Sequence, residues 1–330
     1  MRTSSRHSRN CCGSELHQPL VSAIIPNWNG ALYLPECLDS LRTQTHPRLE
    51  VIVVDNNSTD DSVALVRRHY PEVRVLVLEE NRGLTGGVNA GAKVARGEVL
   101  ALLNNDALVN PAWVAALVDG LVRNPEAGMA ASKMLLYDRP TVINSAGDTF
   151  GRDGIPDNRG VWQEDRGQYD HEEWVFGGCG GAVAYRRDMW QALGGFDEDF
   201  FMYCEDVDLN WRAQLAGYRC IYAPQAVAYH RLSATGGGVT ASYFTGRNTI
   251  GVLIKDLPAS LWRRYWLRML RAQLRIALEA LRAWRGEAAR ARLRGQFAGL
   301  LTWPRWWRKR QAVQESRVVS EEYLESILSI

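Results

Sequence analysis

Residues 21–61, VSAIIPNWNGALYLPECLDSLRTQTHPRLEVIVVDNNSTDD, contain two apolar runs separated by a helical pattern. Val21–Pro26 and Glu50–Asp55 are short and rich in Val and Ile, which is typical of buried strands. Leu32–Thr43 has apolar residues at helical spacing, and Ser58–Asp61 provides N-cap residues for a second helix. The stretch therefore predicts alternating strands and helices, the pattern of a parallel sheet.

The same alternation continues along the chain to residue 103. It predicts strands at Val73–Leu78 and Val99–Leu103 and a helix at Gly86–Ala95. The predicted fold is α/β: a Rossmann-like, mostly parallel sheet with flanking helices. Ligands of such sheets bind at the carboxyl ends of the strands. Four polar segments follow the predicted strands here: Pro26–Asn29, Asp55–Asn57, Glu80–Gly83 and Asn104–Asp106.

The pattern is less regular after Pro111. Ser145–Gly167 is rich in Gly, Asp and Arg and predicts a long surface excursion, the usual place for a specificity loop. Val175–Arg186 is expected to be a strand flanked by glycines, Asp197–Ala216 to lead into a helix, and Ala226–His230 to be a final short strand.

Composition changes sharply near Asp256. From Asp256 to Arg310 there are fourteen Lys and Arg residues against three acids, a segment charge of about +11, together with half of all tryptophans. We therefore expect three regions: a flexible tail at 1–19, a catalytic domain at 20–255, and a basic, Trp-rich helical extension at 256–330.

The extension carries an amphipathic pattern. One helical stripe contains Trp262, Trp266, Leu270, Leu274, Leu278, Leu281 and Trp284, and roughly opposite to it lie Arg264, Arg268, Arg271, Arg275, Arg282 and Arg285. Two interpretations fit: a helix lying in an anionic membrane interface, or a helix packed on the catalytic domain with a solvated arginine face. The segment Trp303–Arg310 favours the membrane surface, because exposed tryptophans beside arginines suit lipid headgroups. Nucleic-acid binding is not expected, because the charge comes without a matching fold motif.

The cysteine pattern and the lack of long apolar runs indicate where in the cell the protein is located. The six cysteines show no repeated spacing and no CxxC pair, so a disulfide framework or a zinc site is not expected and a reducing compartment is favoured. No apolar run approaches the roughly 18 residues of a membrane span, and Met1–His17 lacks the apolar core of a signal peptide. Together with the basic extension, these features predict a cytoplasmic protein at the inner face of the cell membrane.

Four groups of residues are candidates for chemistry. Asp55 ends a buried strand, where its carboxylate either accepts hydrogen bonds from a nucleoside or serves as a turn or cap residue. Asn104–Asp106 either holds Mg²⁺ or Mn²⁺ against a diphosphate or forms an Asx turn. Glu205–Asp208 follows an aromatic run, so its acids either open a helix or line a cleft that raises a carboxylate pKa towards that of a general base. His230 is either structural or a metal or phosphate ligand beside a mobile flap at Thr235–Gly238.

Taken in order, these motifs resemble family 2 glycosyltransferases of the GT-A fold, especially a bacterial rhamnosyltransferase-like branch. The matching segments are SAIIPNWNG at 22–30, VVDNNSTD at 53–60, NRGLTGGVNAG at 81–91, LLNND at 102–106, GGA at 180–182, GGFD at 194–197 and FMYCEDVDL at 201–209. The resemblance covers roughly Leu20 to Lys255.

The resemblance implies inverting transfer of a sugar from a UDP- or dTDP-type donor, dTDP-rhamnose among them, to a hydroxyl of a saccharide or lipid-linked saccharide in cell-surface polysaccharide assembly. It implies that Asp206 deprotonates the acceptor and that Asp106 and His230 hold Mg²⁺ or Mn²⁺. Asn104 and Asn105 replace carboxylates of many relatives, so His230 is expected to contribute more to metal binding. Implied donor-nucleotide contacts are Pro26, Asn27, Asn29, Asp55, Asn57, Asn81, Gly83, Asn89 and Asn105, and implied acceptor-side residues are Trp174, Gly180 and Glu205.

Other functions compete with this interpretation. Gly177–Gly181 fits a G-x-C-x-G nucleophile elbow with Cys179 as nucleophile, and Asp206 and His230 follow in α/β-hydrolase order. An elbow needs a helix after its turn, however, whereas a strand is expected after Cys179. A nucleotidyltransferase would need a Gly- and Lys-rich phosphate loop near the first strand, which is missing. A non-catalytic nucleotide-binding module is disfavoured by Asp206.

Overall fold

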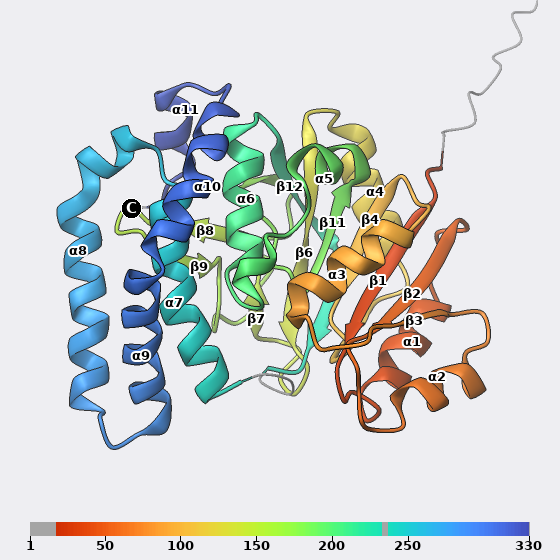
Figure 1. The fold of residues 1–330 in the computed structure, drawn as a ribbon. Helices are drawn as coiled ribbons and strands as arrows, with labels where there is room; N and C mark the ends of the chain where they lie inside the picture. Colours follow the sequence, from red (N-terminus) through yellow and green to blue (C-terminus); the bar gives the residue numbers. More distant parts are fainter. Residues whose placement is uncertain (1–17, 233–236, 330) are drawn as a thin grey trace, which may run out of the picture.

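A ten-stranded sheet runs through the computed structural model, which describes residues 18–232 and 237–329 (Figure 1). Its eight-strand path has the order β10-β12-β6-β11-β4-β1-β2-β3, with β5 paired to β12 and β7 paired to β6. The strands are β1 (Val21–Asn27), β2 (Leu49–Asp55), β3 (Arg74–Val77), β4 (Val99–Leu103), β5 (Ala107–Val109), β6 (Ala127–Leu136), β7 (Ile143–Ser145), β10 (Glu173–Val175), β11 (Ala182–Arg186) and β12 (Arg219–His230). A separate hairpin consists of β8 (Asp148–Phe150) and β9 (Pro156–Asn158).

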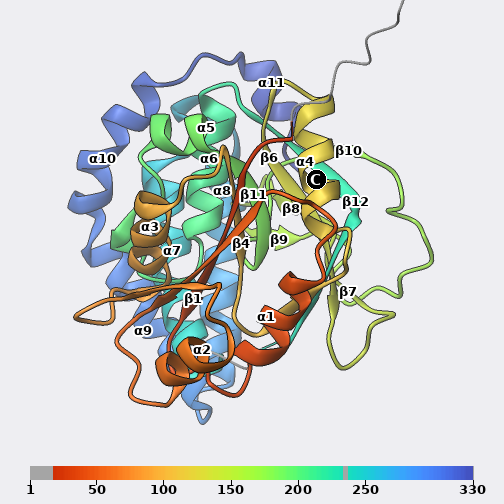
Figure 2. The ribbon, with the colours of Figure 1, turned by 90° about the vertical axis from the view of Figure 1, so that its right-hand side faces the viewer.

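Helices cover both faces of this sheet. They are α1 (Leu34–Arg42), α2 (Ser62–His69), α3 (Gly83–Val94), α4 (Trp113–Arg123), α5 (Arg187–Leu193), α6 (Glu205–Leu215), α7 (Val239–Lys255), α8 (Ala259–Arg282), α9 (Glu287–Leu301), α10 (Trp303–Glu315) and α11 (Glu321–Ser326), with a short 3-10 helix at Glu198–Phe200. Apolar residues of α1 and α4 bury one face of the sheet, and those of α3, α5 and α6 bury the other (Figure 2). This confirms the predicted α/β fold with flanking helices.

The first four strands in the chain form a continuous parallel part of the sheet. β1 pairs in parallel with β2 on one side and with β4 on the other, and β3 extends the sheet beyond β2. The register sets Asn27 opposite Asp55, so the two strands end side by side. Beyond β4, the strand β11 is antiparallel to both of its neighbours, which makes the sheet mostly rather than wholly parallel.

Two predicted elements differ from the structure. Val175–Arg186 is two strands, β10 and β11, because the glycine-rich segment between them passes against α6: a Cβ at Gly177 would lie 2.0 Å from the Asn210 side chain. The last strand, expected at Ala226–His230, begins earlier, at Arg219, and runs in parallel beside β6.

The predicted surface excursion at Ser145–Gly167 is partly wrong. Its first residues are buried: Asp148 is 4% exposed and Phe150 is not exposed at all. Phe150 is buried because its ring packs edge-on against Trp211 of α6, with the ring centroids 5.0 Å apart. Only the later part of the segment, after the β8–β9 hairpin, contains mainly exposed residues.

The C-terminal helices are an integral part of the structure. α7 packs against α9 and α10, while α8 and α9 lie side by side at the edge of the molecule farthest from β2 and β3 (Figure 1). Trp306 of α10 is fully buried, and its ring packs against Phe200 with the centroids 4.9 Å apart. The predicted boundary at Asp256 thus marks a change in composition, whereas α7, α8, α10 and α11 share one apolar cluster with α6.

Candidate active site

A chain of amide and carboxylate groups joins the ends of three strands. Asn105 Nδ2 donates to Asn27 Oδ1 over 2.8 Å, and Asn27 Nδ2 donates to Asp55 Oδ1 over 3.0 Å. The other Asp55 oxygen accepts a bond from Ser58 N–H at 2.9 Å. Asp55 therefore acts as a turn residue and as part of the strand-end network at once, and each carboxylate oxygen keeps a further acceptor site.

Two loops at this edge are tied together by Asn29. Asn29 N–H donates to Ser58 Oγ over 2.8 Å, and its side-chain oxygen accepts from Thr59 N–H over 2.8 Å. Asn29 and Asn57 both have positive φ, near 51° and 59°, and both are exposed. Asparagine adopts positive φ more readily than most other L-residues. Both loops expose their asparagine side chains at the strand ends. Pro26 lies just before them on β1 and is buried.

The start of α3 closes another side of the site. Asn81 Oδ1 accepts from Gly83 N–H at 2.9 Å, and a Cβ at Gly83 would lie 2.3 Å from the Phe201 carbonyl oxygen. Asn89 binds elsewhere, because its amide exchanges hydrogen bonds of 2.8 and 3.0 Å with the backbone of Phe196. Of these predicted nucleotide contacts, Asn81 and Gly83 lie at the strand-end edge. Asn89 instead binds the backbone at Phe196, in the segment between α5 and α6.

Asn56 lies in the predicted strand-end segment Asp55–Asn57, but the sequence analysis gave it no role of its own. Its side chain donates to the Gly83 carbonyl over 2.9 Å and accepts from Arg82 N–H over 3.3 Å, so it joins the end of β2 to the start of α3. A Cβ at Gly87 would lie 2.6 Å from this amide, which explains one glycine of the α3 sequence. The sequence feature that could have indicated this role is the position of Asn56 directly after Asp55, at the end of a strand.

Asp106 and His230, the two predicted metal ligands, lie together. Asp106 Oδ1 is 3.3 Å from His230 Nε2, and the other ring nitrogen, Nδ1, is 3.0 Å from Asn144 Oδ1. Antiparallel pairing of β5 with β12 sets His230 opposite Ala107 and creates this contact. Asn144, on β7, was not predicted.

This pair fits a divalent cation. When Nδ1 donates its proton to Asn144, Nε2 presents a lone pair to the Asp106 carboxylate, and two facing lone pairs need a cation or a proton between them. Adjacent ligands at ~2.1 Å from an octahedral ion lie about 3 Å apart, close to the observed separation. Residues 18–232 and 237–329 contain no group of three or more His, Cys, Asp and Glu side chains that could hold a metal. A cation here would take further ligands from phosphate and water.

Three carboxylates gather at the start of α6. Glu205 and Asp206 open the helix, and the buried Asp148 of β8 joins them through Asn210, whose amide donates to Asp148 over 3.3 Å. Burial, and then the charge of Asp206, raise the pKa of Glu205 and of Asp148 well above their ordinary values. Burial also raises the pKa of Asp206, partly offset by hydrogen bonds. Asp148 was missed because it lies inside a segment that looks like a surface loop.

Asp206 has the contacts expected of a base that is held in place. Its two oxygens accept from Gly180 N–H and Val207 N–H, both at 2.8 Å, and it is partly exposed. Asp208, by contrast, is fully buried and ion-paired with Arg212 and Lys255, which is a structural role.

Gly180 and Gly181 join Asp206 to the Asn104–Asp106 segment. Gly180 N–H binds Asp206, and the Gly181 carbonyl accepts from Asn104 N–H over 3.0 Å. A Cβ at Gly180 would approach both Asp206 and Glu205 within 3.3–3.4 Å. These contacts set the candidate base, Glu205 and the Asn104–Asp106 segment around one short peptide.

Trp174 is not brought to this cluster. It lies on the edge strand β10 opposite Ile221, near the start of β12, whereas His230 is at the end of that strand. Arg219 covers its ring, with the guanidinium 3.7 Å from the ring centroid. The structure therefore gives Trp174 a packing role at the sheet edge.

Cys179 lacks the features of a nucleophile. Strand β11 follows it, so the strand–turn–helix order of a nucleophile elbow is not formed. Burial, and then the charges of Asp148 and Asp206, raise the pKa of its thiol well above the ordinary value. A reactive cysteine needs the opposite shift, which argues against the hydrolase.

The segment before α6 is held in an uncommon backbone conformation. Phe201, Tyr203 and Cys204 have positive φ between 63° and 66°. The buried Asn248 of α7 donates its side-chain amide to the carbonyls of Phe200, Met202 and Tyr203 at 3.0, 2.9 and 2.7 Å. This amide, absent from the sequence prediction, fixes the turn from which Glu205 and Asp206 project.

The profile of Glycosyl transferase family 2 matches residues 22–194. The chain belongs to this family. It is a glycosyltransferase. Among curated relatives, it is 33% identical over 231 residues to the O-antigen biosynthesis protein RfbC of Myxococcus xanthus, covering 66% of this chain but only 18% of that longer protein. It is 28% identical over 258 residues to an N-acetylglucosaminyl-diphospho-decaprenol L-rhamnosyltransferase of Mycobacterium tuberculosis, covering 70% of this chain and 82% of the relative. These relatives confirm the resemblance to the rhamnosyltransferase-like branch.

Solved structures confirm the GT-A fold of this glycosyltransferase. The mannosyltransferase PcManGT from Pyrobaculum calidifontis, in complex with GDP-Man and Mn²⁺, aligns over 91% of this chain and 86% of its own with a TM-score of 0.55 and 21% identity. GalNAc-T7 with UDP, GalNAc and Mn²⁺ aligns over 72% of this chain and 48% of its own with a TM-score of 0.59 and 18% identity. Among the helices of the described residues, none combines the length and apolar character needed to cross a membrane.

Proposed function

We propose that this glycosyltransferase moves a sugar from a UDP- or dTDP-type donor, dTDP-rhamnose among them, to a hydroxyl of a saccharide or lipid-linked saccharide acceptor, with inversion at the anomeric carbon. The observation that carries this proposal is the pair of contacts made by the Gly180–Gly181 peptide. One contact holds Asp206 and the other holds the segment that contains Asp106. A base and a diphosphate site on either side of one peptide suit a single displacement.

Asp206 takes the proton of the acceptor hydroxyl in this mechanism. Two backbone N–H groups orient its carboxylate, and its raised pKa makes it a better proton acceptor than an ordinary aspartate. The acceptor oxygen attacks the anomeric carbon as the bond to the diphosphate breaks, so the configuration inverts. Burial, and then the charge of Asp206, raise the pKa of Glu205 and of Asp148, and Glu205 lines the acceptor side.

The donor would lie along the strand ends. Asp55, Asn27 and Asn105 form a fixed polar edge for the ribose and base, and the exposed loops with Asn29 and Asn57 border it. Asp106 and His230 would hold Mg²⁺ or Mn²⁺, which supplies positive charge to the leaving diphosphate. Two solved structures with a similar fold, GalNAc-T7 and PcManGT, contain Mn²⁺, which supports a divalent ion in this protein.

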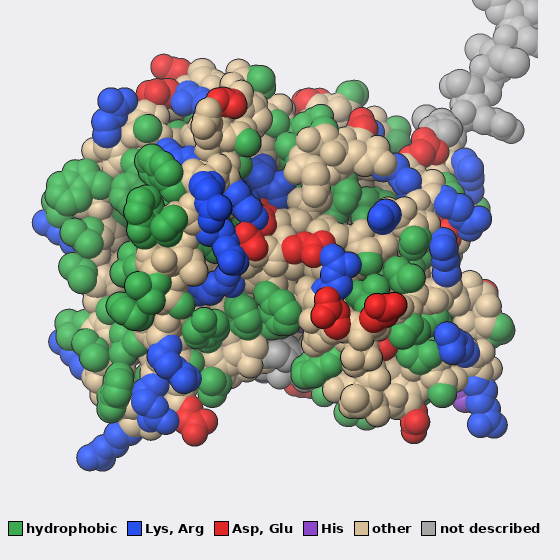
Figure 3. Space-filling model, viewed as in Figure 1, with side chains coloured by type: hydrophobic (Ala, Val, Ile, Leu, Met, Phe, Trp, Pro, Cys, Tyr) green, Lys and Arg blue, Asp and Glu red, His purple; other side chains and the backbone are tan. Residues whose placement is uncertain are grey.

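An exposed apolar face supports association with a membrane. On α8, α9, α10 and the connection between α8 and α9, a group of large apolar side chains, each 46–64% exposed, lies on one side of the molecule (Figure 3). We call this group the apolar face; it consists of Trp266, Leu270, Leu274, Leu278, Leu281, Trp284, Phe297, Leu300, Leu301, Trp303 and Trp307. Arginines flank it, which suits an anionic bilayer surface. We propose that the protein binds peripherally at the inner face of the cell membrane.

The packed-helix interpretation also holds for part of the extension. Leu261, Tyr265 and Met269 bury a second side of α8 against the molecule, and Trp262 Nε1 donates to the Leu253 carbonyl over 2.7 Å. The side of α8 that packs inward thus differs from the side that remains exposed. Removal of the extension is therefore expected to destabilise the protein, whatever its effect on membrane binding.

A donor screen tests the proposed reaction. Purified protein is incubated with UDP-, dTDP- and GDP-sugars with Mn²⁺ or Mg²⁺ and with EDTA, while release of nucleoside diphosphate is followed. We expect release from a UDP- or dTDP-sugar that stops with EDTA, and a product of inverted configuration when an acceptor is supplied. Nucleotide binding without turnover would indicate a binding module, and retained configuration would overturn the single displacement.

A further inference from the structure

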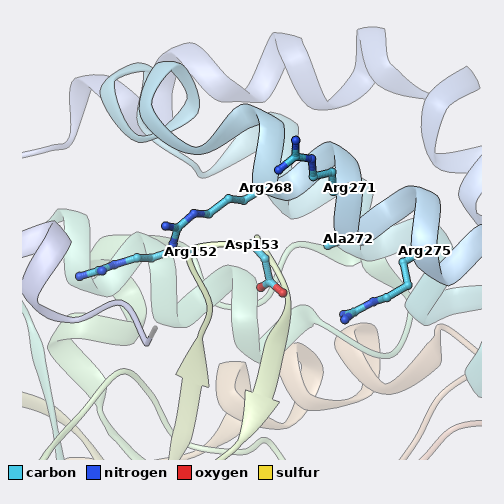
Figure 4. Close-up of a pocket in the computed structure, with 6 residues that line it drawn as sticks. All are labelled: Arg152, Asp153, Arg268, Arg271, Ala272 and Arg275. Carbon is cyan, nitrogen blue, oxygen red and sulfur yellow. The ribbon is translucent and has the colours of Figure 1, made fainter.

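A cavity of about 360 Å³ lies between α8 and the tip of the β8–β9 hairpin (Figure 4). Its lining consists of Arg152 and Asp153 from the hairpin and Arg268, Arg271, Ala272 and Arg275 from α8. We call these residues the arginine pocket. Four of the six are arginines and one is a carboxylate, so the cavity is strongly basic.

The arginines of the pocket lack an acidic ion-pair partner among the described residues. Within the described part of the chain, none of its four arginines forms an ion pair. The Nε of Arg152 is buried and has no hydrogen-bond partner among the described residues. Asp153 is engaged in the hairpin turn, because its Oδ1 accepts from Ile155 N–H over 3.1 Å. A buried guanidinium nitrogen without an acceptor, in a cavity lined with more guanidinium groups, calls for an anionic ligand.

The pocket is built by packing. Tyr265 of α8 lies between two of the arginines, with the guanidinium carbons of Arg152 and Arg268 5.9 and 5.8 Å from its ring centroid. Gly154, at the hairpin tip, has positive φ and comes so close to α7 and α8 that a Cβ would lie 2.6 Å from Leu253. These contacts fix the hairpin against α8 and set arginines from two distant parts of the chain around one space.

The arginine pocket borders the apolar face. Residues three and four apart are neighbours on a helix surface, so Arg271 lies beside Leu274 and Arg275 lies beside Leu278. Both leucines belong to the apolar face. A ligand whose anionic group enters the pocket would therefore place an attached apolar part on the leucines.

We propose that the arginine pocket binds the phosphate of an anionic membrane phospholipid. Phosphate matches the forked donors of arginine, and the neighbouring leucines match acyl chains, which inorganic phosphate and nucleic acid lack. The inference rests on the proposed membrane association and adds a headgroup site to it. The site would fix the orientation of the protein on the bilayer.

The test uses two pairs of substitutions with the same loss of charge. Arg271→Gln with Arg275→Gln removes two arginines from the pocket, and Arg282→Gln with Arg285→Gln removes two exposed arginines farther along the chain. Thermal melting establishes that both variants fold. Binding of monomeric dihexanoyl phosphatidylglycerol is measured by calorimetry, and binding to phosphatidylglycerol and phosphatidylcholine vesicles by co-sedimentation.

We expect the pocket variant to bind the soluble phosphatidylglycerol at least tenfold more weakly than wild type, and the control variant to change less than twofold. Equal weakening in both variants would overturn the pocket, since total charge alone would explain it. Equal affinity for inorganic phosphate and phosphatidylglycerol would overturn the lipid assignment. Wild-type protein that ignores all vesicles, yet binds the soluble lipid through the pocket arginines, would instead count against membrane association.

Discussion

Asp206 and Asp208 lie two residues apart on α6 and have opposite surroundings. Asp206 is partly exposed and accepts hydrogen bonds from backbone N–H groups, whereas Asp208 is enclosed by Arg212 and Lys255. Changing Asp206 to Asn should lower transfer at least 10²-fold, the loss typical of a missing general base, with donor affinity nearly unchanged. Steady-state kinetics and donor titration measure the two quantities.

Asp208→Asn provides the contrast for this prediction. It breaks a buried ion pair, so it should lower the melting temperature, whereas Asp206→Asn should not. An Asp206→Asn protein that retains more than a tenth of wild-type turnover would show that another group is the base.

Glu205 makes stability depend on pH. Its pKa is raised well above the ordinary value of about 4.3, by burial and by the charge of Asp206. The folded state therefore holds the Glu205 proton more tightly than the unfolded chain does, and this contribution to stability falls as pH rises above the ordinary value. Glu205→Gln, which cannot ionise, should raise the melting temperature by about 2–4 °C at neutral pH and have little effect below about pH 4.

Melting curves between acidic and neutral pH measure this difference. Glu126→Gln, at an exposed carboxylate, is the matched control and should show no such trend. A constant difference between Glu205→Gln and wild type across the range would contradict a raised pKa of Glu205.

At the scale of elements, α7 determines the geometry at the start of α6. Asn248 donates to three carbonyls of the turn in which Phe201, Tyr203 and Cys204 have positive φ. Each such residue costs about 1–3 kcal/mol and persists only when its surroundings fix it. Asn248→Ala should therefore misplace Asp206 and lower kcat at least tenfold, with a smaller change in donor affinity.

A matched control for this prediction is Asn124→Ala. Asn124 also donates its amide to a backbone carbonyl, that of Gly120, but at the end of α4. The control should keep its activity. Normal turnover in Asn248→Ala would indicate that the turn is fixed without this amide.

The elements differ in how far the sequence predicts them. The strand ends with Asn27, Asp55 and Asp106 were predicted because buried apolar runs stop there and polar residues follow. Asp148 and Asn248 were not, because each acts through a partner distant in sequence: Asp148 contacts α6, and Asn248 of α7 holds the turn before it. Periodicity reports which face of an element is buried, but it does not report which other element covers that face.

At the scale of the whole molecule, the apolar face gives a prediction about membranes. Leu274→Glu with Leu278→Glu adds charge to that face at two side chains that are about half exposed and lie outside the buried core. Binding to phosphatidylglycerol vesicles should fall at least tenfold in co-sedimentation, while the melting temperature stays near that of wild type.

The matched control adds the same charge elsewhere. Leu32→Glu with Val122→Glu changes two exposed apolar residues outside the apolar face, and vesicle binding should fall much less. A similar loss in both variants would mean that net charge, rather than the apolar face, governs binding.

The ion pairs of Asp197 have a consequence for the protein during synthesis. Asp197 lies just before the turn that leads to α6, and its carboxylate is bound both by Lys255 and by Lys309, which is 112 residues later in the chain. Burial opposes ionisation of this carboxylate, but the two lysines lower its pKa below the ordinary value. While a ribosome is still translating the last helices, the carboxylate has only part of this support. The nascent chain should consequently remain inactive until α10 has emerged and docked, although every residue assigned to sugar transfer was translated long before.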